Sequence, residues 1–137
     1  MRIDFSTVED VESFVSVPEG VYLCRIAEVR EGLTRDGSTR WTFRLEVAEG
    51  EFAGRTAAWD GISFSDRGMP RVKQVLARFG FDTRGTLEFG PEDLQGLLVR
   101  ATVFAEERED PTTGRRVERM RVPYLGYEPA DLESSPS

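Results

Sequence analysis

The sequence contains no histidine and a single cysteine, Cys24. Without imidazole or a second thiolate, the usual ligand sets for zinc cannot be assembled, and no internal disulfide bond can form. The missing histidine also removes the usual proton carrier near neutral pH and the triads that depend on it. The 25 acidic residues formally leave carboxylate chemistry open, but their abundance singles out no pair. We therefore expect no catalytic residues, no metal site and no cofactor, that is, a protein that is not an enzyme.

Long apolar runs are also absent. No stretch approaches the roughly 20 residues that a membrane-spanning helix needs, and no basic and then apolar segment follows Met1. We therefore expect a cytoplasmic protein without a membrane partner. Its 137 residues, 39% of them hydrophobic, fit one compact domain with its own core.

Positive charge is scarce overall, because the net charge is −7. That balance is unfavourable for nucleic-acid binding, in which Lys and Arg contacts to phosphate dominate the affinity. The excess of acidic residues lies at the two ends, whereas residues 20–126 carry 17 basic and 17 acidic side chains. All the basic residues of this central part except Lys73 are arginine, which suits bidentate contacts to phosphates or bases, although a GC-rich genome produces the same bias.

The chain divides into three parts. Residues 1–19 are predicted to form an N-terminal arm, residues 20–126 the folded domain, and residues 127–137 a disordered acidic tail that contains Pro and Ser. Apolar residues of the arm are spaced for one side of an irregular or briefly helical segment that docks on the domain. These residues are Phe5, Val8, Val11, Phe14 and Val15.

Three strands are predicted in the first half of the domain. The β-branched run 21–29 is typical of a strand, and an Asp36-Gly37 turn separates it from the second strand. In that second strand, residues 41, 43, 45 and 47 are apolar and alternate with polar residues, which predicts one core face and one solvent face. The third strand covers residues 55–64. It places Trp59 with Ala57 on its exposed face, and Gly61 is a candidate bulge.

The second half of the domain begins with a helix. Val72, Val75, Leu76 and Phe79 recur at the i, i+3, i+4 and i+7 positions of one helical face, and Gly80 is a suitable stop. A single turn is expected at residues 92–94. Two strands follow at residues 97–105 and 115–122, joined by the hairpin loop 109–114.

The predicted order is therefore strand, strand, strand, helix, strand, strand. This is the order of an OB-fold, an all-β class with one helix, in which a five-stranded, partly open Greek-key barrel binds ligands across its second and third strands. A small β-barrel of another connectivity is the structural alternative.

Several segments carry a family resemblance. They are residues 18–22 (PEGVY), 40–47 (RWTFRLEV), 49–55 (EGEFAGR) and the helix 72–80. Together, over roughly residues 5–122, they resemble a phage and prophage family, long described as a domain of unknown function, that is similar to OB-fold single-stranded-DNA-binding proteins. The resemblance implies a non-catalytic protein of replication or recombination that binds single-stranded DNA.

Sequence-independent binding of a single strand needs aromatic rings on which bases stack and positive charge along the backbone. Trp59 is the stacking candidate, with a place inside the barrel or under the arm as the equally weighted alternative, whereas the alternation around Trp41 favours a core role. The candidate phosphate contacts are arginines on the second strand, on its preceding loop and on the last hairpin. They are Arg35, Arg40, Arg44, Arg115, Arg116, Arg119 and Arg121.

The same hairpin carries four acidic residues that could neutralise the last arginines: Glu106, Glu107, Glu109 and Asp110. The alternative function is therefore a protein-protein interaction module that keeps the OB architecture without binding nucleic acid. RNA in place of DNA, and replication or recombination proteins, are further candidate partners. Open strand edges also offer a route to a homo-oligomer.

Overall fold

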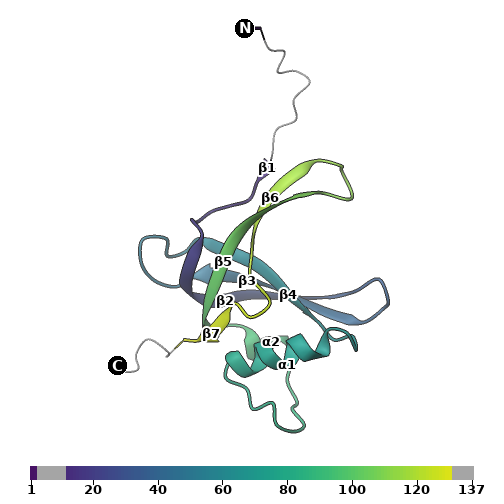
Figure 1. Ribbon diagram of the computed structural model, residues 1–137. Helices are drawn as coiled ribbons and strands as arrows, with labels where there is room; N and C mark the ends of the chain where they lie inside the picture. Colours follow the sequence, from purple (N-terminus) through teal and green to yellow (C-terminus); the bar gives the residue numbers. More distant parts are fainter. Residues whose placement is uncertain (3–11, 131–137) are drawn as a thin grey trace.

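The computed structural model describes residues 1–2 and 12–130. In these ranges the chain forms a mostly antiparallel β-sheet and two short helices (Figure 1). The elements in chain order are β1 (Glu12–Ser13), β2 (Gly20–Leu33), β3 (Thr39–Val47), β4 (Thr56–Ser63), α1 (Met69–Arg78), α2 (Pro91–Leu94), β5 (Leu98–Glu109), β6 (Arg116–Arg121) and β7 (Tyr127–Pro129). The predicted order of three strands, a helix and two strands is thus present, with β1 and β7 added at its ends.

The long strand β2 organises the sheet. Its first part pairs with β5 and its second part with β3, and Cys24 and Arg25 pair with both neighbours. The strand order is β1-β6-β5-β2-β3-β4, with β7 added to β5. Every pairing is antiparallel except that of β1 with β6. Figure 1 shows β2 and β5 curving, so that the two ends of the sheet turn toward each other.

The sheet is not closed. Strand β6 lies beside β4, but no ladder joins the two within the described strands. At Gly61 in β4, side chains satisfy the backbone instead: Arg71 Nη1 donates to the carbonyl oxygen at 2.7 Å, and the N–H donates to Asp60 Oδ1 at 2.8 Å. These backbone groups of β4 therefore have hydrogen-bond partners although no described strand is paired with β4 on the side opposite β3.

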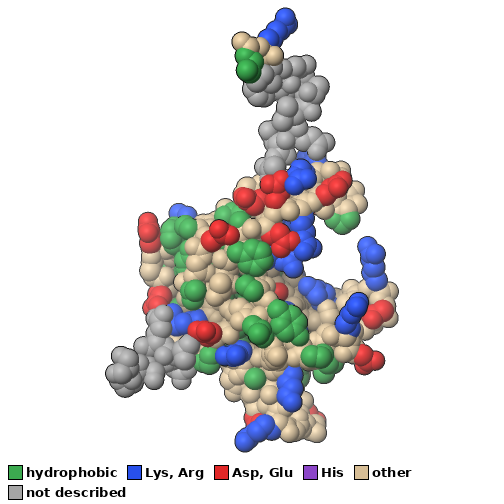
Figure 2. Space-filling model, viewed as in Figure 1, with side chains coloured by type: hydrophobic (Ala, Val, Ile, Leu, Met, Phe, Trp, Pro, Cys, Tyr) green, Lys and Arg blue, Asp and Glu red, His purple; other side chains and the backbone are tan. Residues whose placement is uncertain are grey.

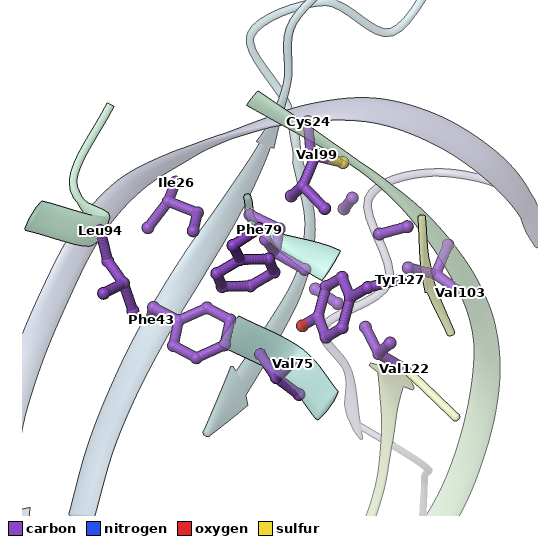
Figure 3. Close-up of a cluster of buried hydrophobic side chains, with 14 of the residues drawn as sticks. Cys24, Ile26, Phe43, Val75, Phe79, Leu94, Val99, Val103, Val122 and Tyr127 are labelled. Carbon is purple, nitrogen blue, oxygen red and sulfur yellow. The ribbon is translucent and has the colours of Figure 1, made fainter. Parts of the chain in front are cut away.

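The core is centred on three aromatic rings from three distant segments. Phe79 lies 6.0 Å from Phe43 and 5.1 Å from Tyr127, measured between ring centroids, and Figure 3 shows the three side chains among aliphatic ones. Phe43 comes from β3, Phe79 caps α1 and Tyr127 begins β7. Their contacts hold the helix and the C-terminal strand against the sheet.

Helix α1 confirms the prediction made from the apolar spacing of its residues. Val72, Val75, Leu76 and Phe79 are all buried. Gly80 follows the helix with φ +103°, a left-handed conformation that favours glycine, and Phe81 N–H donates to the Leu76 carbonyl oxygen. In Figure 1 both helices lie at the end of the molecule opposite the projecting β5–β6 hairpin. Neither helix of the described ranges has the length and apolar character that crossing a bilayer requires.

The bulge in β4 lies at Ala57 and not, as the sequence suggested, at Gly61. Leu45 pairs with Ala58 and the next residue, Glu46, pairs with Thr56, so Ala57 is the extra residue. Gly61 keeps a regular pairing with Thr42. Because of the bulge, Ala57 and Ala58 are both buried, and the expected sharing of an exposed face by Ala57 and Trp59 is wrong.

The described part of the N-terminal arm is irregular, one of the two expected conformations, except for the two-residue strand β1. Glu12 and Ser13 pair in parallel with β6, and Phe14 N–H donates to the Glu118 carbonyl oxygen at 2.9 Å. Val15 packs against the core, and Val17 is buried in it. The other arm residues named above, Phe5, Val8 and Val11, lie outside the described residues.

The prediction of a disordered tail is wrong for residues 127–129, and residues 131–137 of that predicted tail lie outside the described residues. Residues 127–129 form β7 on the edge of β5, and the Tyr127 side chain is only 2% exposed. The prediction of disorder from residue 127 followed the acidic and Pro-containing composition of the segment. The large aromatic surface that Tyr127 buries outweighs that composition.

Candidate nucleic-acid interface

An open cleft of about 250 Å³ lies between β4 and β6, where the sheet is not closed. Its lining residues come from β3, β4, β6 and the N-terminal arm. They are Phe14, Arg40, Thr42, Thr56, Ala57, Ala58, Trp59, Asp60, Gly61, Arg119, Met120 and Arg121. In Figure 2, Lys and Arg side chains gather along the concave side of the molecule, between the β5–β6 and β2–β3 hairpins.

Trp59 lines this cleft and is not a core residue. Its cross-strand partner is Arg44, so its side chain lies on the polar face of β3 and not on the face of Phe43. The ring is partly exposed, and the guanidinium of Arg30 from β2 lies 4.9 Å from its centroid, a cation–π contact. Sequence reasoning missed Arg30, although the alternation of β2 and β3 around their hairpin could have placed it near Trp59.

Phe14 supplies a second aromatic ring to the same cleft. Its side chain is 52% exposed, and the guanidinium carbon of Arg119 lies 4.6 Å from the ring centroid. From the sequence, Phe14 was expected only to help dock the arm on the domain. No local sequence pattern could have placed it beside β6, because the β1–β6 pairing joins segments about a hundred residues apart.

Arg40 lies flat against β4 at the edge of the cleft. Its Nη1 donates to Ser63 Oγ at 2.8 Å, and a Cβ atom built on Gly61 would lie only 2.4 Å from its Nη2. The missing side chain at position 61 therefore makes room for the guanidinium. Across the described parts of the chain, neither Arg40 nor Arg119 has a carboxylate at ion-pair distance.

Of the other five candidate arginines, one lines the cleft and four lie outside its lining. Arg121 lines the cleft, and Glu106 lies 3.9 Å from it. Arg44 lies on the same sheet face outside the cleft lining, 3.8 Å from both Glu28 and Glu46. Arg116 pairs with Glu107 at 2.5 Å, and Arg35 and Arg115 are exposed in the two hairpin loops. The structure thus brings Trp59, Arg40, Arg119 and Arg121 together and leaves the remaining four candidates outside the cleft lining.

The expected neutralisation by the acidic hairpin residues occurs in part. Glu107 pairs with Arg116, and Glu106 contacts both Arg108 and Arg121. These contacts reduce the positive charge of the hairpin but leave Arg40 and Arg119 as positive groups facing the cleft.

Among the described residues, Asp60 is the one carboxylate that lines the cleft, and its charge is compensated. Asp60 Oδ2 accepts hydrogen bonds from Arg71 Nη2 at 2.8 Å and from the Tyr127 hydroxyl at 2.5 Å. Burial raises the pKa of Tyr127 well above its ordinary value, and the nearby Asp60 charge raises it further, so the hydroxyl keeps its proton and donates. Asp60 therefore ties β4 to α1 and β7, and its ion pair with Arg71 limits its repulsion of an anionic ligand.

Two residues have the non-functional roles that the sequence indicated. Cys24 is buried, and burial raises the pKa of its thiol to about 12, so it is a core filler and not a reactive group. Trp41 is buried beside Phe64 and Phe89, with ring centroids 4.8 and 5.3 Å away. In the described ranges, no three Cys, Asp or Glu side chains are grouped so that they could hold a metal ion.

No protein-family model matches this chain, and no curated protein matches it.

Proposed function

We propose that this chain is a non-catalytic OB-fold protein that binds single-stranded DNA in the cleft between β4 and β6. The observation that carries the proposal is the cleft lining itself: two aromatic rings, Phe14 and Trp59, share one open surface with Arg40, Arg119 and Arg121. Stacking platforms combined with positive charge are what sequence-independent binding of a single strand requires.

The strand arrangement supports an OB-type barrel that is open between β4 and β6. The first long strand, β2, pairs with both β3 and β5, and α1 lies between the third and fourth long strands. OB-folds bind ligands across their second and third strands, here β3 and β4, between the first and last hairpin loops. Both hairpins flank the basic concave side in Figures 1 and 2.

A single strand fits this surface better than a duplex does. Bases in a duplex are stacked on one another, whereas a single strand has free base faces for Trp59 and phosphates for the arginines. The resemblance of residues 18–22, 40–47, 49–55 and 72–80 to a phage and prophage family of unknown function, itself similar to OB-fold single-stranded-DNA-binding proteins, agrees with this proposal. A role in phage replication or recombination, in the cytoplasm, is the corresponding biological proposal.

The test is fluorescence anisotropy of a labelled thymidine strand of about 30 nucleotides, titrated in low salt beside a duplex of the same length. We expect micromolar or tighter binding to the single strand and much weaker binding to the duplex. Equal binding to both would indicate non-specific attraction to phosphate and would contradict the proposed role of stacking.

We expect the affinity for the single strand to depend moderately on the salt concentration, because the proposed site has three arginines that contact phosphate. If Arg40, Arg119 and Arg121 each neutralise one phosphate, the plot of log K against log salt concentration has a slope of about −2, because single strands give about −0.7 per phosphate. The affinity then falls about twentyfold between about 50 and 200 mM salt. The triple Arg→Gln variant of these residues should have a nearly flat plot, and an unchanged slope in that variant would place the phosphate contacts elsewhere.

A protein-protein interaction module is the second candidate function. It is favoured by the ion pairs Arg116–Glu107 and Arg121–Glu106, which neutralise part of the β5–β6 hairpin, and by the net charge of −7. Absence of single-strand binding even in low salt would support this candidate over the first.

A further inference from the structure

The N-terminal arm holds Phe14 in a fixed position on the wall of the cleft. Phe14 N–H donates to the Glu118 carbonyl oxygen, and Ser13 Oγ donates to Glu118 Oε1 at 3.0 Å. Three residues further on, Val17 is buried in the core. The backbone on both sides of Phe14 is thus attached to the domain, whereas the ring itself stays half-exposed.

Covering apolar surface is favourable, so a half-exposed phenylalanine ring at an anchored position offers surface that a ligand can bury. Within the described residues, the cation that lies over the Phe14 ring is the guanidinium of Arg119, 4.6 Å from the ring centroid. Val15, one residue later, packs against the core in the ordinary way. The Phe14 ring is therefore available to a ligand in the cleft.

The two aromatic residues of the cleft are arranged alike. Trp59 on the β4 side has a guanidinium 4.9 Å from its ring centroid, and Phe14 on the β6 side has one at 4.6 Å. In each pair a guanidinium lies against the ring. Arg119 has no carboxylate at ion-pair distance among the described residues and can contact an adjacent phosphate, whereas Arg30 donates to Glu28 Oε1 at 2.9 Å, so its charge is partly compensated. Two such pairs on one cleft match two bases of the same strand better than they match one.

We propose that Phe14 is a second base-stacking residue, so that the cleft binds two bases of one DNA strand, one on Trp59 and one on Phe14. This inference rests on the proposed function. It makes the N-terminal arm part of the binding site, in addition to its packing role.

Two substitutions at position 14 separate stacking from anchoring. Phe14→Leu keeps an apolar side chain but removes the flat ring, and Phe14→Trp replaces the phenyl ring by another flat aromatic ring. We expect Phe14→Leu to weaken binding of the labelled ~30-nucleotide thymidine strand about five- to thirtyfold, and Phe14→Trp to bind at least as tightly as the unmodified protein. Thermal unfolding of both variants should occur at the temperature of the unmodified protein.

The control is Tyr124→Ala, which removes an aromatic side chain of similar exposure, 55%, outside the cleft lining. It should leave the affinity unchanged. If the unmodified protein binds and Phe14→Leu binds equally well, the second stacking position is refuted while the proposed function stands. If the unmodified protein does not bind the strand, the proposed function itself fails.

Discussion

Replacing Trp59 by alanine is expected to weaken binding of the ~30-nucleotide thymidine strand ten- to a hundredfold while leaving the fold intact. Stacking of one base on an aromatic ring contributes about 1–3 kcal/mol, which corresponds to roughly five- to 150-fold in affinity. We expect the loss of affinity on removing Trp59 to lie in the upper part of this range, because an indole offers a larger face for stacking than a phenyl ring. The measurement is the anisotropy titration in low salt.

The stability of the Trp59 variants is the necessary control. Trp59 is outside the buried core, so its truncation leaves no enclosed cavity, and urea unfolding should change little. Trp59→Phe keeps a flat ring and should retain most of the affinity. An alanine variant that binds as tightly as the unmodified protein would exclude Trp59 from the interface.

Replacing Tyr127 by alanine is expected to lower the free energy of unfolding by about 3–5 kcal/mol. This is a large part of the total of about 5–15 kcal/mol typical of such domains. The ring is buried against Phe43 and Phe79, and its hydroxyl donates to Asp60. The measurement is urea unfolding at equilibrium.

Two further variants divide this effect. Tyr127→Phe removes only the hydroxyl and should cost about 1–2 kcal/mol, since Asp60 keeps its partner Arg71. Tyr124→Ala, three residues away and largely exposed, should change the stability by less than about 1 kcal/mol. Similar losses at positions 124 and 127 would show that β7 does not contribute to the core.

Local patterns were sufficient to predict the main elements. The alternation in β3 buries Trp41, Phe43, Leu45 and Val47 as expected, because period-two apolar spacing produces one dry face of a sheet. The apolar stripe of α1 likewise faces the core, and Gly37, with φ +84°, allows the turn between β2 and β3. In each case the signal lies within about ten neighbouring residues.

Features that depend on distant pairing could not be predicted in this way. β7 forms because Tyr127 fits between Phe43 and Phe79, which are 84 and 48 residues away in the chain. The bulge at Ala57 depends on the register of β4 against β3, and a single residue of register decides which side chains share a face.

The candidate site shows the same division. Arg40 and Trp59 were predicted on solvent-facing positions, and the register of β3 with β4 places both at the cleft. The four candidate arginines outside the cleft lining lie in loops or beside carboxylates. They are Arg35, Arg44, Arg115 and Arg116. Sequence shows which residue types are present, whereas the tertiary pairing decides which of them face a common ligand.

The buried thiol of Cys24 can report local opening of the fold. Cys24 pairs with Val47 of β3 and Val99 of β5, at the point where β2 passes from one neighbour to the other. Its high pKa and lack of exposure keep the thiol unreactive in the closed state. The labelling rate of this single thiol by a thiol-specific reagent therefore measures how often the β3–β2–β5 junction opens, without any engineered probe.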